Sequence, residues 1–398
     1  MLTATAGDLA RRWPLPHTSQ LVGLIVRLAF IAPGVAPDTG GVETVVTELA
    51  RALVARDVAV EVWTQQRGLR RPAVLHLDEI VVRRFPCSNS VHYPLSPQLW
   101  RHTRRSIGGL DLLHGHSYHS AVNLGVLASD CRVPFVYSPH YHGTGHTWPA
   151  RALHRVYGPI GRRLVRRAAR VIAVSWAEAR MLQRDFPGVE PRLSVVHNGV
   201  ATRSIAAAHP MPGQPPTLLS LGRLEGYKRI DAVIEAFDRV TSPGQLIVVG
   251  DGPARGRIED LATRSRRSED IRVLGRISDA EVARWLRTAS GVVNLSEHEA
   301  FGLVALEGAA GGAAVLLSDI DAHREVANLL DGRVTLVHPY DRTVVAQAME
   351  SLLRGANNGP REDVGTWEQA ADCYMEVYRS VVADRIGSDG QLTSASSA

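Results

Sequence analysis

The sequence predicts an α/β protein made of two doubly wound domains with parallel sheets. Strand and helix patterns alternate along the 398 residues, as expected for sheets covered by helices. The chain is too long for one hydrophobic core, and its 45% hydrophobic residues suffice for two. Periodicity is lost at 201–216, where Ala, Pro and Gly dominate, so we place the linker between the domains there.

The first half opens with a polar, Pro-containing stretch at 1–20, which we expect to be a flexible extension. The apolar run 24–34 contains Arg27 and lacks a small-residue cleavage pattern, so it predicts a first strand rather than a signal peptide. Residues 40–57 have apolar positions at helical spacing and predict the first helix. Residues 58–64 (VAVEVWT) predict the next strand.

The second half repeats this alternation. A Leu-rich strand ends at Gly222, and Ile230, Val233, Ile234 and Phe237 then follow helical spacing. The segments ASGVVNLS and AAVLLSD predict two further strands on either side of a helix. A last helix starts near Trp367. The predicted ranges are a first domain at 21–205, a second at 206–366, a helix at 367–386 and a disordered tail at 387–398.

The segment EAFGLVALE carries two carboxylates, Glu299 and Glu307, around Phe301-Gly302-Leu303. It follows a strand and opens a helix, so it lies at the edge where open parallel sheets bind ligands. The first free N–H groups of such a helix favour a phosphate. Glu307 lies ~6 Å further along the axis than Leu303, where it can accept hydrogen bonds from a ribose. The alternative is an amphipathic helix with two surface glutamates.

Arg223 and Lys228 occupy another loop of the same kind, between a strand and a helix. Arg grips an anion with a planar fork and Lys adds a point charge. Two fixed cations suit a diphosphate that must be held and then released. The alternative is solvated surface charge, which most Arg and Lys residues carry.

These motifs, with their order and spacing, resemble the retaining glycosyltransferases of family 4, from about residue 24 to 378. The E-x7-E and GR-x4-K signatures match in full. The GG-x-E signature also matches at Gly40, Gly41 and Glu43, and LHGH ends at His116. The resemblance implies the GT-B architecture: two Rossmann-like domains facing a central cleft, with the last helix packing back on the first domain.

The resemblance also implies an activity. A sugar would move from a nucleotide sugar, with UDP as first choice and GDP as second, to the hydroxyl of a polysaccharide, lipid-linked or natural-product acceptor. The anomeric configuration would be retained, through same-face attack with the leaving phosphate as base. Two alternatives remain open: a nucleotide-sugar epimerase on this fold and a non-catalytic nucleotide-sugar-binding protein.

The roles implied for individual residues fall into three groups. The catalytic set is Glu299, His116, Arg223 and Lys228. The nucleotide and diphosphate set is Gly41, Arg223, Lys228, Phe301, Gly302, Leu303 and Glu307. Gly40 and His140 face the acceptor or the donor sugar.

The chain departs from the family pattern after Glu307. It reads EGAAGGAAV where EAxAxGxPV is usual, with Gly308 for Ala and Ala314 for Pro. Glycine costs about 1 kcal/mol in a helix interior, so we expect a loosened helix here.

No metal or other cofactor is expected. The histidines at 114, 116 and 119 and at 140, 142 and 146 have no matching carboxylate cluster, and Asp319-x-Asp321 is misplaced for a metal-binding DxD motif. The three cysteines are far apart, which fits a reducing cytoplasm.

The net charge of +5 is partly concentrated in arginines between Arg162 and Arg170. At helical spacing these form one basic side after a helix break at Gly158-Pro159. That side is either a solvated face or a weak peripheral contact with the inner face of a membrane. Nucleic acid is not expected as a partner, because no reader module accompanies the charge. No run of 18 apolar residues predicts a membrane span.

Overall fold

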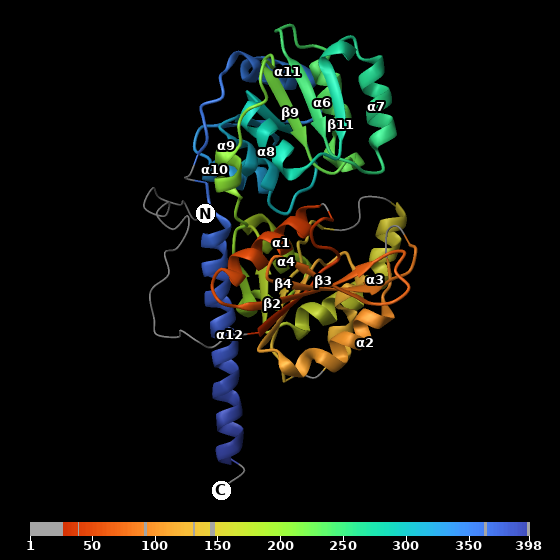
Figure 1. The fold of residues 1–398 in the computed structure, drawn as a ribbon, viewed down its shortest axis with the longest axis vertical. Coiled ribbons are helices and arrows are strands. Elements are labelled where there is room, and N and C mark those ends of the chain that lie inside the picture. The colour runs from red at the N-terminus through yellow and green to blue at the C-terminus, as the bar shows by residue number, and fades with distance from the viewer. Residues whose placement is uncertain are drawn as a thin grey trace. The chain divides into compact units, whose positions relative to one another are not determined.

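The computed structural model describes residues 27–38, 40–90, 94–129, 132–143, 148–361 and 364–395. The extension predicted at 1–20 lies outside them. The chain divides into two compact units, Met1–His197 with Trp367–Ala398 and Asn198–Thr366 (Figure 1). We call them unit 1 and unit 2. The boundary at 197/198 lies before the linker predicted at 201–216.

Unit 1 contains an eight-stranded sheet in the order β3-β4-β2-β1-β5-β6-β7-β8. All neighbours are parallel except β3 and β4, which form an antiparallel edge. The strands are β1 Arg27–Ile31, β2 Ala59–Gln66, β3 Ala73–Leu77, β4 Ile80–Pro86, β5 Leu112–His116, β6 Phe135–Ser138, β7 Arg170–Ala173 and β8 Leu193–Val195. The helices are α1 Gly41–Val54, α2 Pro97–Ser106, α3 Trp148–Arg167, α4 Trp176–Asp185 and α12 Trp367–Ala395.

The C-terminal helix α12 packs against α1 within unit 1. Arg56 binds Asp372 across 2.6 Å and donates to the carbonyl of Glu368. Further along α12, the hydroxyl of Tyr378 lies 2.7 Å from Nδ1 of His114 at the centre of the sheet. The helix continues to Ala395, into the range 387–398 where a disordered tail is predicted.

Unit 2 contains a six-stranded, wholly parallel sheet in the order β11-β10-β9-β12-β13-β14. The strands are β9 Thr217–Leu221, β10 Gln245–Val249, β11 Ile271–Gly275, β12 Gly291–Asn294, β13 Ala314–Ser318 and β14 Val334–Val337. The helices are α5 Thr202–Ala207, α6 Ile230–Phe237, α7 Arg255–Arg264, α8 Asp279–Thr288, α9 Leu303–Gly311, α10 Asp321–Leu329 and α11 Arg342–Arg354.

Part of the predicted linker is the helix α5, which packs on α8 and α9. Thr202 and Ile205 are buried there. The Ala-rich composition that suggested a linker is also favourable for a helix, so composition alone misplaced this segment.

Helices cover both faces of the unit 2 sheet, as the sequence predicted. Leu218, Val248 and Val293 share one core with residues of α6 and α11. On the other face α9 lies so close to β12 that a Cβ added to Gly308 would sit 2.7 Å from Cγ2 of Val292. A Cβ on Gly311 would sit 2.5 Å from the carbonyl oxygen of Leu286. The expected loosening of this helix is therefore wrong, because its glycines permit close packing.

The basic segment belongs to α3, which is continuous through Pro159, so the predicted break at Gly158-Pro159 is wrong. Leu164 and Val165 are buried, while Arg162, Arg163 and Arg166 are exposed. This is the arrangement of a core helix with a basic outer face. Among the described residues, no helix combines the length and the apolar character that a membrane crossing requires.

Candidate functional site

Two loops at the carboxyl edge of the unit 2 sheet bring Lys228 and Glu299 together. Lys228 follows β9 and Glu299 follows β12, and these strands are parallel neighbours. The Nζ of Lys228 lies 2.6 Å from Oε1 of Glu299, and the two side chains are only 16% and 15% exposed. Asn294, the last residue of β12, donates to the same oxygen across 3.2 Å. Residues 71 positions apart thus form one buried ion pair.

Both members of this pair are charged at neutral pH. Burial by itself would raise the pKa of Glu299, but the charge of Lys228, that of His323 and hydrogen bonds from Lys228 and Asn294 lower it to about 2. Burial likewise opposes the charge of Lys228, and Glu299 outweighs it, so the pKa of Lys228 is raised. Lys228 and Glu299 therefore form a charged pair that is held in place and largely shielded from water.

The helix α9 begins just beyond Glu299. Phe301 is 3% exposed and anchors the turn. Gly302 adopts a left-handed conformation (φ 109°, ψ 48°) and provides no side-chain cap for the helix. The amide of Ala305 donates to the carbonyl of Gly302 across 3.0 Å, so the amides at the mouth of α9 are those of Leu303 and Val304. Glu307 lies half-buried in the second turn. The structure thus has a carboxylate, Glu299, beside the start of the helix α9, as the segment EAFGLVALE predicts.

Arg223 lies on the same loop as Lys228 but faces outward. Its side chain is 61% exposed and pairs with Glu225 across 3.2 Å. Among the contacts of the described residues, it makes none with Lys228 or Glu299. The structure thus joins Lys228 and Glu299 and leaves Arg223 as a cation at the surface of the loop.

Several residues around this pair were not found from the sequence. His323, at the start of α10, is fully buried, and Nδ1 lies 2.9 Å from the carbonyl oxygen of Ser318. Its ring lies against Gly302, where an added Cβ would be 3.3 Å from Cδ2. The sequence contains a hint of Asn294, because this residue lies within the predicted strand ASGVVNLS. His323 had none, because only folding brings its loop to α9.

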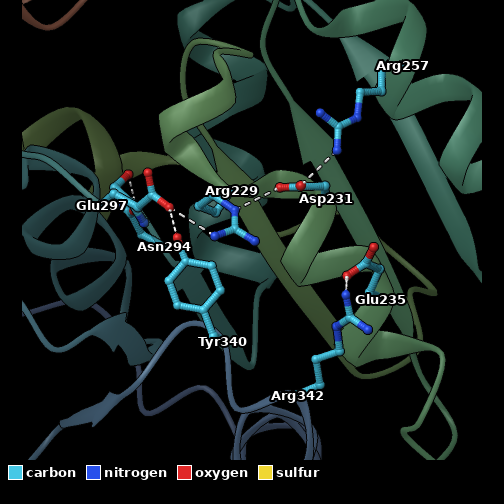
Figure 2. Close-up of polar contacts among 9 residues, drawn as sticks. Arg229, Asp231, Glu235, Arg257, Asn294, Glu297, Tyr340 and Arg342 are labelled. Carbon is cyan, nitrogen blue, oxygen red and sulfur yellow. Dashed lines mark hydrogen bonds and ion pairs between the residues drawn. The ribbon is translucent and has the colours of Figure 1, made fainter. Parts of the chain in front are cut away.

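A second group of missed residues flanks the pair. Arg229, Glu297 and Tyr340 contact one another across three loops (Figure 2). The discounted Asp319 and Asp321 both pair with Arg324 on the surface.

In unit 1 the predicted His116 and His140 meet at the carboxyl ends of β5 and β6. Nδ1 of His116 lies 3.1 Å from Nε2 of His140, and the rings stack at 5.4 Å. Burial lowers the pKa of His140 to about 4 and holds the pKa of His116 well below its usual value. Both imidazoles are therefore neutral at pH 7 and can exchange hydrogen bonds with hydroxyl groups.

Gly40 and Gly41 lie at the start of α1, after β1. Gly40 is the N-cap, and a Cβ there would lie 2.2 Å from Oε2 of Glu43, so this carboxylate folds back over the glycine. Around Gly41 an added Cβ would meet nothing within 4 Å. The mouth of α1 is therefore open at its first residue.

Within the part of the chain that the structure describes, no three His, Cys, Asp or Glu side chains form a group able to hold a metal ion. His146 lies outside that part. The absence of a cofactor stays a prediction.

Comparisons with known proteins identify the family of this chain. Residues 39–204 match the family model Glycosyltransferase Family 4, and residues 202–366 match Glycosyl transferases group 1. A D-inositol 3-phosphate glycosyltransferase from Streptomyces bingchenggensis is 32% identical over 326 residues, which cover 71% of this chain and 70% of the relative. The chain belongs to glycosyltransferase family 4.

Other similar proteins extend the comparison. A GDP-mannose:cellobiosyl-diphosphopolyprenol alpha-mannosyltransferase from Komagataeibacter xylinus is 29% identical over 371 residues, 87% of this chain and 91% of the relative. A sucrose-phosphate synthase structure from Thermosynechococcus elongatus superposes with a TM-score of 0.72 at 20% identity, covering 90% of this chain and all of that one. The predicted GT-B fold and the glycosyltransferase class are confirmed.

Proposed function

We propose that this glycosyltransferase moves a sugar from a nucleoside-diphosphate sugar to an acceptor hydroxyl, with retention of configuration. The observation that carries the proposal is the buried Lys228–Glu299 pair at the mouth of α9. A cation, a carboxylate and the first amides of a helix meet there, and these are the groups that a sugar diphosphate needs.

The diphosphate gains negative charge as the bond to the sugar breaks. Lys228 and the amides of Leu303 and Val304 stabilise that charge, and Arg223 adds a cation from the surface of the loop. Because Lys228 is already fixed by Glu299, little reorganisation is needed at the moment of reaction. Glu307 accepts hydrogen bonds from the ribose.

Glu299 orients hydroxyl groups of the donor sugar and does not act as a nucleophile. Its Oε1 is occupied by Lys228 and Asn294, and a carboxyl pKa of about 2 makes it a weak base. The acceptor oxygen therefore bonds to the anomeric carbon directly, on the face that the diphosphate leaves. The diphosphate keeps the bonding electrons and takes the proton of the acceptor hydroxyl.

Unit 1 supplies the acceptor side. The neutral His116 and His140 offer hydrogen bonds to sugar hydroxyls, and Gly40 and Gly41 let ligand atoms approach the backbone at α1. UDP is our first choice of nucleotide, with GDP second because a relative is named for GDP-mannose. We further propose that the enzyme needs no metal and works in the cytoplasm on a polysaccharide, lipid-linked or natural-product acceptor.

The test is a panel of labelled UDP-, GDP- and ADP-sugars, followed with and without acceptor extracts. Transfer of label supports the proposal. Interconversion of the free donor would indicate an epimerase, and binding without turnover a binding protein. Lys228→Ala should lower kcat by ~10²-fold or more, the scale of losing a transition-state charge partner. Arg324→Ala, which removes a surface cation of the same unit, should leave kcat unchanged.

A further inference from the structure

The two loops that carry Lys228 and Glu299 are joined by three successive contacts. The backbone N–H of Glu297 donates to the carbonyl of Tyr227 across 2.9 Å. Lys228 then pairs with Glu299. Arg229 makes the third contact, because Nη1 lies 2.9 Å from Oε1 of Glu297. Residues 227–229 are therefore tied to the other loop at three points, two on Glu297 and one on Glu299.

Arg229 has an unusual backbone for its residue type. Its φ of 53° and ψ of 37° are left-handed, a conformation that glycine adopts freely and a residue with a Cβ adopts at a cost. Strain of this kind persists where the surrounding structure uses the residue. The backbone at 229 therefore favours glycine. We infer that contacts of the arginine side chain offset the cost of this conformation.

That side chain is 15% exposed and is held on three sides (Figure 2). Nε lies 3.2 Å from Asp231, Nη1 binds Glu297, and the guanidinium carbon lies 4.5 Å from the ring centre of Tyr340. The hydroxyl of Tyr340 donates to the same Oε1 of Glu297. Arg229 and Tyr340 together fix Glu297 from the loops after β9 and β14. We call these three residues the Arg229 brace.

We propose that Arg229 is a positioning residue for sugar transfer. Through Glu297 it holds the loop that carries Glu299, and so keeps Glu299 beside Lys228 at the mouth of α9. This rests on the proposed function of the Lys228–Glu299 pair. Arg229 does not touch the pair itself. Its effect is on geometry, and small displacements of a positioned charge lower kcat strongly.

The chain offers a selective test. Arg229→Gly removes the side chain and keeps a residue that suits the left-handed backbone. Arg257→Ala is the matched control: Arg257 is 68% exposed and binds the other oxygen of Asp231 across 3.0 Å, away from Glu297. Arg229→Lys restores a charge beside Glu297 without the planar fork that also reaches Asp231.

Arg229→Gly should lower kcat on the order of 10-fold or more and change KM by less than about 3-fold, because the loss concerns the transition state more than ground-state binding. Arg229→Lys should fall between Gly and the wild type, and Arg257→Ala should match the wild type. Glu297→Gln should add no further loss to Arg229→Gly, since both act through one contact. A wild-type kcat in Arg229→Gly, or equal losses in Arg257→Ala, would overturn the brace.

Hydrogen exchange separates this proposal from the proposed function. The backbone amides of 295–302 should exchange faster in Arg229→Gly than in the wild type and Arg257→Ala, whether or not a donor sugar is transferred. Unchanged exchange would refute the brace by itself. A wild-type protein that binds no nucleoside diphosphate, yet shows the faster exchange in Arg229→Gly, would refute the function and leave the brace supported.

Discussion

Replacing Lys228 by Met removes the charge of the Lys228–Glu299 pair and keeps most of the side-chain stem. The partner Glu299 would then be a buried carboxylate without its cation, 15% exposed and held by the amide of Asn294. Breaking a buried pair in this way is costly because the remaining charge has lost its water and its partner. Unit 2 should therefore lose stability.

The size of the loss follows from the pKa of Glu299. The pKa is lowered from 4.5 to about 2, and one pKa unit is about 1.4 kcal/mol, so the charged form is stabilised on the order of 3 kcal/mol. Because the pKa is lowered, this stability is fully present above pH 4.5 and is lost as the pH falls toward 2. Without Lys228, burial should instead raise the pKa of Glu299 above 4.5.

Urea unfolding of the wild type and Lys228→Met between pH 3 and 8 tests this reasoning. The difference in unfolding free energy should be at least on the order of 3 kcal/mol at pH 7. It should begin to shrink as the pH falls through the raised pKa of Glu299 in the variant, above 4.5, and should go on shrinking toward pH 2. Adding Glu299→Gln to Lys228→Met should recover much of the loss, because no charge remains buried. Arg324→Ala is the control. It breaks a pair of the same length, 2.6 Å, whose members are 56% and 41% exposed, and it should cost less than about 1 kcal/mol.

Two results would refute the argument. One is a loss in Lys228→Met no larger than in Arg324→Ala, which would mean that the pair is well solvated. The other is a difference that stays constant from pH 7 to pH 3, which would mean that Glu299 is not the group left uncompensated.

Two further predictions concern other parts of the molecule. Unit 1 should lose stability as the pH falls from about 6.5 through 4. Burial lowers the pKa of His140 to about 4, so the folded state excludes a proton that the unfolded chain takes up. The unfolding free energy of His140→Gln should depend less on pH in this range, and an equal dependence would show that His140 is not the group responsible. Gly308→Ala should destabilise unit 2 by about 1–3 kcal/mol despite the better helix propensity of alanine, because the new methyl group would meet Val292 at 2.7 Å. Thermal unfolding measures the loss, and the control is Gly256→Ala in α7, where a Cβ would meet nothing within 4 Å. A Tm of Gly308→Ala at or above that of the wild type would show that β12 shifts to accommodate the methyl group.

Local patterns determined much of the fold. The sequence predicted strands at ASGVVNLS and AAVLLSD, which contain β12 and β13, and the helix from Ile230 to Phe237. Period and composition, on which these predictions rest, are properties of neighbouring residues. The order of strand, loop and helix also placed Glu299 and Lys228 at the carboxyl edge of one sheet. Composition did not predict the structure at 201–216, because an Ala-rich segment can form either a linker or a helix. It also did not predict the packing at Gly308, because the free-energy cost of glycine in an isolated helix does not include contacts with a neighbouring strand.

The sequence by itself thus determined the architecture and which loops carry the chemistry, because both follow from short-range order along the chain. Only the tertiary structure decided the partners of each side chain. It joined Lys228 to Glu299 across 71 positions, turned Arg223 outward and placed Arg229 and Tyr340 around Glu297. Such contacts depend on how loops from separate strands pack at one sheet edge. Pairing at that edge, which no local pattern encodes, keeps Lys228 and Glu299 charged despite their burial.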